Sequence, residues 1–401
     1  MNKFILIFVS LCTLLHSNIL TGLDVLQRDH FKLLHNKNVG LVVNHTSVNK
    51  DGVHILDLLL SHELIKIQSI FTPEHGLKGN FSAGEKIPNT FNKDLNINIV
   101  SLYGKTHEPE LSDLDGLDCI VFDIQDIGSR YYTYVSTLTY ILNAASKVDL
   151  PVIILDRPNP LGRKVFGPII SSDFYSFVGM HPIPIRHGMT IGELGIMINE
   201  EGWLKSGKKV NLTIYKIENW DKSLGYFSIP PSPNIPSLET AIIYNGMCLF
   251  EGTNVSEGRG TKSPFTLFGA PWVDSQELLK ELLDKDLEGV RFYQKAFKPI
   301  SIEGVSKHPK YKDELCHGVK IDINEKEKVN PLMISILALQ IISKNHPDHF
   351  SFNQNNFIQN LYGSRKIKDY IVNQYSMSRI MEDWAEDCRQ FRSLRAEHLI
   401  Y

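Results

Sequence analysis

The sequence is poor in cysteine, in net charge and in long apolar runs, and each shortage excludes a class of protein. Only five cysteines occur in 401 residues, and none forms a CxxC pair, so neither a disulfide scaffold nor a zinc site is expected. A formal net charge of −3 gives no reason to expect a nucleic-acid partner. The hydrophobic share of 42% and the charged share of 22% are those of an ordinary globular protein.

Several catalytic signatures are also absent. The chain has no HExxH, no GxxxxGK[ST] and no GxSxG, which argues against a zinc peptidase, a P-loop nucleotide hydrolase and a serine hydrolase of the nucleophile-elbow type. Gly258 and Gly260 form a Gly-x-Gly, but it lacks the third glycine and the strand-to-helix setting of a dinucleotide site. We therefore expect no metal and no other cofactor. A reaction based on carboxylates remains.

The one long apolar stretch lies at the N-terminus. A lysine at position 3 precedes a mainly apolar segment over 4–15, and small and polar residues follow it. This pattern predicts a signal peptide over about 1–20 and export to the periplasm or the extracellular space; an uncleaved N-terminal anchor is the alternative. No other segment is apolar enough to span a bilayer, so no stable membrane partner is expected.

The next part of the chain, 22–240, alternates strand-like and helix-like patterns. Continuous apolar strands interleaved with amphipathic helices predict a mostly parallel sheet covered on both faces, in a Rossmann-like α/β layout. The expected strands lie at 39–43, 65–71, 97–103, 118–124, 151–156 and 210–217, and the expected helices at 54–64, 134–148 and 190–204.

A proline-rich passage at 228–240 cannot form a central strand or a helix interior, and we place a domain boundary just after it. A chain of this length favours two domains. The second unit, 241–401, is expected to be a smaller α+β domain that closes a cleft against the first. Its predicted elements are a helix near 275–285, strands at 298–304 and 317–323, and helices from about 331 to 395.

Polar residues gather where the expected strands of the first domain end. In an open parallel sheet, ligands bind outside the carboxyl ends of the strands, because loops and helix N-termini meet there. Four successive strand ends supply acid, amide, guanidinium and histidine groups to one edge: Asn44; Glu74 and His75; Asp123, Gln125 and Asp126; and Asp156, Arg157 and Asn159. Each of these residues has an alternative role as a helix cap or turn residue.

Glu74 is the strongest of these candidates. Glutamate is uncommon in turns, and here it stands between Pro73, which stiffens the approach, and Gly76, which permits a sharp exit. A side chain held on such a bend at a strand's carboxyl end is favourably placed for function.

Two further clusters are candidates for ligand binding. Arg130 stands beside Tyr131 and Tyr132, where a guanidinium suits a carboxylate and the tyrosines can present hydroxyls or simply fill the core. Past the proline-rich passage, a loop dense in charged and polar residues is typical of a binding loop, although a solvated loop would look the same. Its candidates are Glu251, Asn254, Glu257 and Arg259. His187 is a weaker candidate, because Thr190 and Glu193 nearby form a capping box.

Six motifs in order resemble one known family. They are PEHG (73–76), FDIQDIGSRYYTY (122–134), DRPNPLG (156–162), RHGMTIGELG (186–195), PSPNIPSLETAIIYNG (231–246) and LFEGTNVSEGRGT (249–261). Together they resemble the exo-β-N-acetylmuramidase family (NamZ-like). The resemblance implies a secreted glycoside hydrolase that removes non-reducing terminal N-acetylmuramic acid from peptidoglycan fragments. It also implies a Rossmann-like domain, a smaller second domain and an active site in the cleft between them.

The resemblance makes the glutamate of PEHG, Glu74, the leading catalytic candidate, and general acid is the role it implies. His75 would tune that acid or bind substrate. The second catalytic group stays open between Asp123, Asp126 and the substrate's own acetamido group. Muramic acid carries a lactyl carboxylate, so an arginine partner is expected, with Arg130, Arg157 and Arg259 as the options.

Two rival functions fit the same residues. A secreted binding protein would hold a muramyl sugar in its cleft without cleaving it. An esterase or amidase would act on another bond of the same cell-wall fragments.

Overall fold

The structure is a computed structural model that describes residues 19–225 and 227–401. The predicted signal peptide at 1–20 lies almost wholly outside the described residues. Within the described part of the chain, no helix is both long and apolar enough to cross a membrane.

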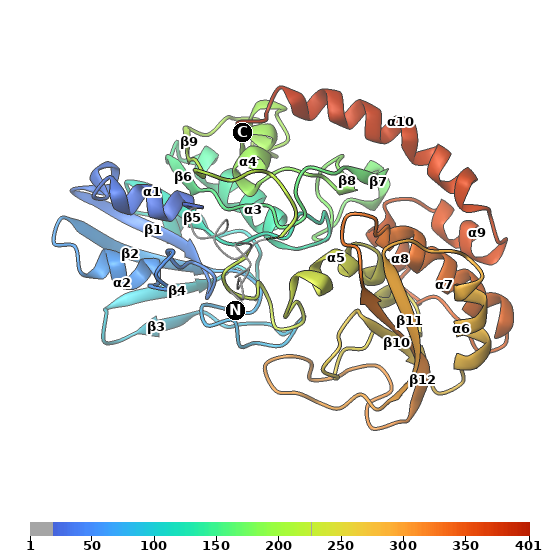
Figure 1. The fold of residues 1–401 in the computed structure, drawn as a ribbon. Helices are drawn as coiled ribbons and strands as arrows, with labels where there is room; N and C mark the ends of the chain where they lie inside the picture. The colour runs from blue at the N-terminus through green and yellow to red at the C-terminus, as the bar shows by residue number, and fades with distance from the viewer. Residues whose placement is uncertain (1–18, 226) are drawn as a thin grey trace, which may run out of the picture.

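A seven-stranded, mostly parallel sheet forms the first half of the molecule, which confirms the predicted fold class (Figure 1). Its strand order is β3-β4-β2-β1-β5-β6-β9, and only β3, at the edge, runs antiparallel to its neighbour. The strands are β1 (Lys37–Val43), β2 (Ile65–Thr72), β3 (Thr90–Asn92), β4 (Ile97–Ser101), β5 (Cys119–Asp123), β6 (Val152–Leu155) and β9 (Leu212–Tyr215).

Helices cover both faces of this sheet, and alternation along the strands decides which face each side chain joins. On β1, Leu41 and Val43 pack in one cluster with α1 (Gly22–Arg28) and α2 (Ile55–Leu60), whereas Val42 belongs to the larger cluster that contains α3 (Tyr134–Lys147) and α4 (Ile191–Glu200). Covering both faces explains why the central strands read as nearly continuous apolar runs.

A three-stranded antiparallel sheet and most of the remaining helices form the second half. The sheet order is β10-β12-β11, with β10 (Leu267–Ala270), β11 (Val290–Phe297) and β12 (Cys316–Ile323). The helices are α5 (Leu238–Met247), α6 (Ser275–Leu283), α7 (Pro331–Asn345), α8 (Phe357–Tyr362), α9 (Lys366–Val372) and α10 (Met377–Ala396). A small hairpin of β7 (Phe166–Ile169) and β8 (Pro184–Arg186) lies apart from both sheets.

The sequence placed one strand of the second half wrongly. The strand expected at 298–304 is instead β11, which ends at Phe297, and Pro299, which has no backbone N–H to donate to a ladder, falls in the loop that follows. The proline-rich passage at 228–240 ends in a helix cap, because the Ser237 hydroxyl accepts the Thr240 N–H at 3.2 Å and α5 begins at Leu238.

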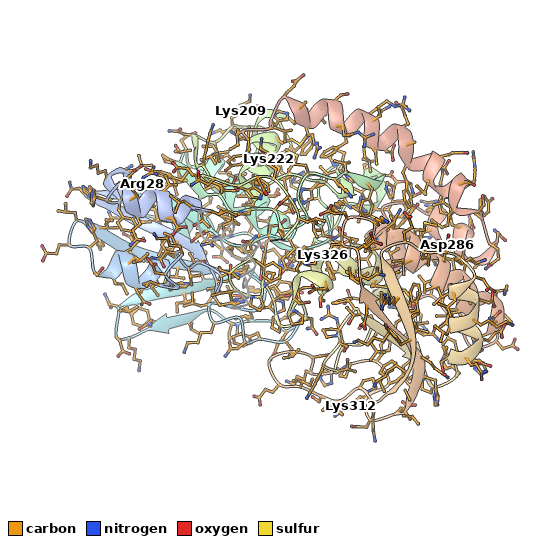
Figure 2. The ribbon with its side chains drawn as sticks, in the orientation of Figure 1. Arg28, Lys209, Lys222, Asp286, Lys312 and Lys326 are labelled. Atoms are coloured by element: carbon orange, nitrogen blue, oxygen red, sulfur yellow. The ribbon has the colours of Figure 1, made fainter. Side chains whose placement is uncertain are left out.

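The two halves share one apolar core, and α10 spans them (Figure 1). At the end of α10, the Arg395 guanidinium donates to the carbonyl oxygens of Gly188 at 2.8 Å and Arg163 at 3.0 Å. Figure 2 shows the side chains in the same orientation, with Lys209 near the top edge of the molecule and Lys312 near the bottom edge. The C-terminal segment therefore returns to the first half and fixes it against the second.

A close helix crossing at Gly246 gives a stability test. A methyl group at this position of α5 would overlap the backbone carbonyl of Pro331, the first residue of α7. Alanine in place of a helical glycine normally stabilises by about 1 kcal/mol, but here we expect Gly246→Ala to lower the free energy of unfolding by about 1–3 kcal/mol through overpacking. Urea denaturation measures the change, and a stabilised variant would contradict the crossing.

Candidate active site

The residues that follow β2, 73–76, form a tight turn, and two of them have left-handed backbone conformations. The Gly76 N–H donates to the Pro73 carbonyl at 3.0 Å, and both His75 and Gly76 have φ of 71°. Glycine adopts this conformation freely, whereas His75 pays a conformational cost, which is commonly found where a site needs a fixed geometry. The His75 ring is buried, and its Nδ1 lies 2.8 Å from the Phe81 carbonyl. His75 thus holds the loop that follows the turn.

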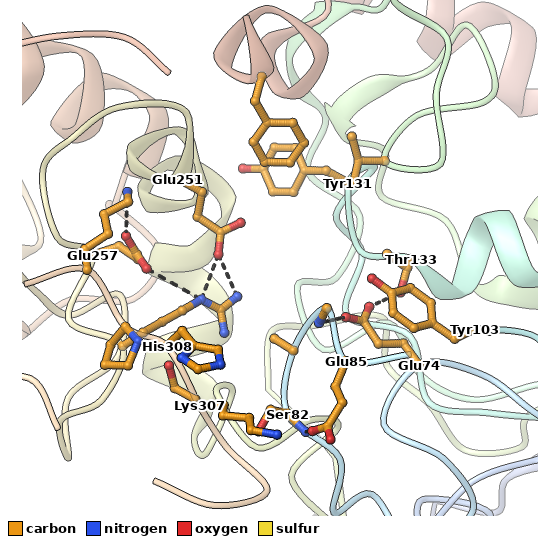
Figure 3. A pocket seen from close by; sticks show the side chains of 18 of the residues that line it. Glu74, Ser82, Glu85, Tyr103, Tyr131, Thr133, Glu251, Glu257, Lys307 and His308 are labelled. Carbon is orange, nitrogen blue, oxygen red and sulfur yellow. Dashed lines mark hydrogen bonds and ion pairs between the residues drawn. The ribbon is translucent and has the colours of Figure 1, made fainter. Parts of the chain in front are cut away.

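That loop and α3 together fix the Glu74 carboxylate. One oxygen accepts the Gly84 N–H at 3.0 Å, and the other accepts the Thr133 hydroxyl at 2.9 Å. Thr133 is the N-cap residue of α3. Tyr103 lies beside this carboxylate (Figure 3), and burial, reinforced by the charge of Glu74, raises the pKa of its hydroxyl above the usual value. A carboxylate oxygen can accept more than one hydrogen bond, so both oxygens remain able to meet a ligand.

The opposite wall is built around Arg259. Its guanidinium contacts the Glu251 carboxylate at 2.6 Å and lies 3.7 Å from Glu257, and Lys310 contacts Glu257 at 2.9 Å. Burial opposes charge on Arg259, but the two carboxylates outweigh it and raise the pKa of the guanidinium further. Lys310 and Arg259 likewise overcome burial and lower the pKa of Glu257. Arg259 and Glu257 are therefore both charged at neutral pH.

A cavity of about 620 Å³ separates the two walls. Figure 3 shows Glu251 and Glu257 on one side, Glu74, Thr133 and Tyr103 on the other, and Tyr131 between them at the top of the view. Such a mixture of aromatic surface and a few convergent polar groups is typical of a small-molecule site. Further lining residues include Ser82, Glu85, Phe177, Tyr244, Lys307 and His308.

A smaller hollow of about 40 Å³ continues behind Glu74 and shares Tyr131 and Arg259 with the main cavity. Among the described residues, Arg259 Nη1 and the Asn234 side-chain oxygen are buried without a hydrogen-bond partner, and both residues line this hollow. Buried polar atoms are normally satisfied, so these two are available to a bound polar group.

The strand-end rule placed the right elements together, but several side chains it selected are engaged in holding the edge of the sheet. Strands β1, β2, β5 and β6 are parallel neighbours or next neighbours, so their carboxyl ends meet at one edge. At that edge Asp123 is fully buried and pairs with Arg157 at 2.5 Å and 2.9 Å. Neither residue lines the cavity, and the two are engaged with each other in a buried ion pair.

Asp126 and His187 are also buried outside the cavity lining. One Asp126 oxygen accepts the Gly128 N–H at 2.7 Å, and His187 Nε2 lies 3.8 Å from the same oxygen. Burial raises the pKa of Asp126 to about 7 and lowers the pKa of His187 to about 3. Both groups are therefore largely uncharged over much of the acidic range.

Four other selected residues hold backbone or helix ends. The Gln125 amide donates to the Pro158 carbonyl at 2.8 Å, and the Asn159 amide donates to the Met189 carbonyl at 2.9 Å. Asn44 donates to the Tyr134 hydroxyl at 3.0 Å. Asp156 accepts the Gly192 N–H at 2.8 Å at the start of α4. These contacts explain why amide and acid residues follow the strands.

Arg130 does not reach the cavity either. Its guanidinium donates to four backbone carbonyls, of Pro168, Ile183, Leu361 and Tyr362, at 2.7–2.9 Å. Burial lowers the pKa of Arg130 to about 10. This residue therefore connects the β7–β8 hairpin to α8, and of the three arginines proposed for a carboxylate only Arg259 faces the cavity.

The remaining selected residues divide in the same way. Tyr131 lines both the main cavity and the smaller hollow, and Tyr132 lines the smaller hollow. Asn254 instead stabilises its own loop by donating to the His349 carbonyl at 2.7 Å. Glu74, Tyr131, Glu251, Glu257 and Arg259 are thus the predicted residues that the structure brings together around the main cavity.

Sequence reasoning missed Tyr103, Thr133 and Lys310. Tyr103 follows β4, so the strand-end rule contained the signal. Thr133 stood inside the motif that supplied Tyr131 and Tyr132. Lys310 lies in a loop without a motif, close to the strand that was misplaced. Within the described part of the chain, no group of three or more histidine, cysteine, aspartate or glutamate side chains could hold a metal ion.

The raised pKa of Asp126 predicts a pH effect on stability. Between pH 4 and pH 7 the unfolded chain releases this proton while the native chain keeps it, so the native state binds more protons and stability falls as pH rises. Asp126→Asn should remove about 2–4 kcal/mol of that fall. Urea denaturation at pH 4.5 and 7 measures it, with the exposed Asp51→Asn as control. An unchanged pH slope would contradict the assignment.

Comparisons with known proteins identify the family of the chain. The family model described as exo-β-N-acetylmuramidase NamZ, N-terminal, matches residues 39–239, and the C-terminal model of the same name matches 242–401. The chain is 36% identical to a peptidoglycan β-N-acetylmuramidase NamZ of Bacillus subtilis (strain 168) over 387 residues, which is 95% of this chain and 91% of that protein.

Two solved structures of DUF1343 family proteins from Bacteroides fragilis NCTC 9343 share the fold. One superposes with a TM-score of 0.86 at 31% identity, and the other with 0.80 at 34% identity; each match covers 96% of this chain and 99% of the other. With models matching nearly the whole described sequence and a relative of this identity, the chain belongs to the NamZ family of exo-β-N-acetylmuramidases and is a glycosidase.

Proposed function

We propose that this chain releases non-reducing terminal N-acetylmuramic acid from peptidoglycan fragments during cell-wall turnover, with Glu74 as the general acid. The observation that carries the proposal is the position of Glu74: its carboxylate is fixed by two donors on the wall of a cavity of about 620 Å³, opposite the Arg259 cluster. Glycoside hydrolysis requires a proton donor at the leaving oxygen, and the named activity of the Bacillus relative supports that reaction.

The sugar would lie between the two walls. Glu74, on the wall made by the turn after β2, would deliver its proton to the glycosidic oxygen. The lactyl carboxylate would meet Arg259, whose Nη1 is buried without a partner among the described residues, because a guanidinium is suited to hold a carboxylate. Tyr131 and Tyr244 would provide apolar surface to the ring.

Two of the three options that the sequence left for the second catalytic group lie outside the cavity lining. Asp123 and Asp126 do not line the cavity, which favours the substrate's acetamido group or another cavity carboxylate. Of the latter, Glu251 and Glu257 are each held by a cation, whereas Glu85 accepts a backbone N–H from Ser82 at 3.2 Å.

Export fits this substrate, since peptidoglycan lies outside the cytoplasmic membrane. The apolar segment at 4–15 supports secretion, and sequencing the N-terminus of the protein recovered from its native host would reveal whether about twenty residues have been removed.

Replacing Glu74 tests the acid role. Glu74→Gln keeps the size and the hydrogen bond from Gly84 but loses the proton, so kcat on an N-acetylmuramyl disaccharide should fall by about 10²–10⁴-fold. The matched control is Glu63→Gln, an exposed glutamate at the other end of β2, which should keep normal activity.

Mass analysis of the disaccharide products separates the rival functions. Two monosaccharides are expected from the unmodified protein, whereas binding without cleavage would favour a sugar-binding protein, and loss of an acyl or amide group would favour an esterase or amidase. Full activity in Glu74→Gln would refute the acid role.

Replacing Arg259 tests recognition of the lactyl group. Arg259→Lys keeps one charge but loses the forked donor set. We expect kcat/KM on a chromogenic N-acetylmuramide to fall about tenfold or more, the loss of one charge-assisted hydrogen bond, and the value for the N-acetylglucosaminide to change little. The control is Arg291→Lys, an exposed arginine on β11. An equal loss on both substrates would contradict a lactyl contact.

A further inference from the structure

Besides the cavity and the smaller hollow behind Glu74, the structure has another hollow beyond the rim of the cavity, which we call the second hollow. It has a volume of about 240 Å³ and is lined by aromatic side chains, Tyr140, Tyr175 and Trp203, together with Glu108, Asn143 and Lys205. Tyr175 has 44% of its surface exposed. Aromatic faces beside a few fixed polar groups suit a sugar, because a pyranose ring offers a C–H face to stack and hydroxyls at its edge to bind.

The walls of this hollow are held rigid from below. Trp203 stacks on the His181 ring with centroids 5.0 Å apart, and His181 Nε2 lies 2.7 Å from the Thr139 hydroxyl. The Asn143 amide donates to Glu108 at 2.9 Å, and its side-chain oxygen accepts the Ser206 N–H at 2.9 Å. A preformed hollow of this kind loses little entropy when it binds a ligand.

One loop joins this hollow to the cavity. Tyr175 and Met180 line the second hollow, while Phe177 and Val178, between them in sequence, line the cavity. A run of ring contacts crosses the loop: Tyr103 lies 5.6 Å from Phe177, and Phe177 lies 6.3 Å from Tyr140. The aromatic surface is therefore continuous from the side of Glu74 to the second hollow.

The spacing fits a glycan. Thr133, which holds Glu74, caps α3, and Tyr140 follows seven residues later on the same helix. At 1.5 Å per residue this is about 10 Å along the axis, close to the length of two linked sugars. An enzyme that removes one terminal sugar must let the rest of the chain leave across its rim.

Resting on the proposed function, we propose that the hollow of Tyr140, Tyr175 and Trp203 is a leaving-side subsite. It binds a sugar of the peptidoglycan glycan about two units beyond the bond that is cleaved, and Lys205 meets an acidic substituent of that sugar. The occupant is the glycan strand and not the peptide attached to it, because aromatic faces dominate the hollow.

The test compares kcat and KM on three substrates: a chromogenic N-acetylmuramide, the N-acetylmuramyl disaccharide, and the tetrasaccharide made of two such units. For the unmodified protein we expect kcat/KM to rise about tenfold from disaccharide to tetrasaccharide, the factor that about 1.4 kcal/mol of added binding gives. Tyr175→Ala should remove most of that gain by raising KM for the tetrasaccharide at unchanged kcat. It should leave the chromogenic substrate unaffected.

The matched control is Tyr293→Ala, a tyrosine with 45% exposure on β11, which should keep the full gain. Equal kcat/KM on disaccharide and tetrasaccharide, or a gain that survives Tyr175→Ala, would overturn the subsite while leaving the proposed function standing. The same comparison on a peptide-bearing tetrasaccharide tests the occupant, and a Tyr175→Ala loss seen only with that substrate would overturn the glycan assignment. If none of the three substrates is cleaved, the proposed function fails and the subsite with it.

Discussion

The site depends on two hydrogen bonds to one carboxylate. Glu74 accepts the Gly84 N–H and the Thr133 hydroxyl, and these two donors belong to different parts of the fold. Gly84 is in the loop that His75 holds through the Phe81 carbonyl, and Thr133 occupies the N-cap position of α3, a helix packed against the sheet. Glu74 follows the end of β2, the turn sets the direction of its side chain, and Thr133 at the start of α3 holds its carboxylate. The orientation of the proposed acid therefore depends on packing that extends well beyond the cavity.

Charge is distributed unevenly around this carboxylate. On the facing wall, Arg259 and Lys310 form ion pairs with Glu251 and Glu257. The groups that donate to Glu74 are instead uncharged, a backbone N–H and a hydroxyl. Beneath the sheet edge, the pairing of Asp123 with Arg157 removes another acid from the cavity. The buried pairs cost desolvation, and they fix the walls between which the Glu74 carboxylate can meet a sugar.

Much of the fold could be predicted from the sequence, because alternating apolar runs and amphipathic helices specify a doubly covered parallel sheet. The misplaced strand at 298–304 shows the limit: β11 has exposed residues on one face and lacked a continuous apolar run. For the site, the strand-end rule pointed to Glu74, which lines the cavity. The rule could not distinguish a side chain that lines a cavity from one that is buried in an ion pair. Asp123 and Arg157 come within reach of each other only when β5 and β6 pair in the folded sheet. Lys310 comes from a loop whose position is set by tertiary packing alone.

We propose that Glu74 delivers a proton to a glycosidic oxygen held between the two walls. The most direct measurement is a crystal structure of the Glu74→Gln variant soaked with the N-acetylmuramyl disaccharide. We expect the muramyl ring in the cavity of about 620 Å³, with its glycosidic oxygen about 2.6–3.2 Å from the side chain at position 74 and its lactyl group toward Arg259. A disaccharide bound elsewhere, or bound here with the glycosidic bond turned away from position 74, would contradict it.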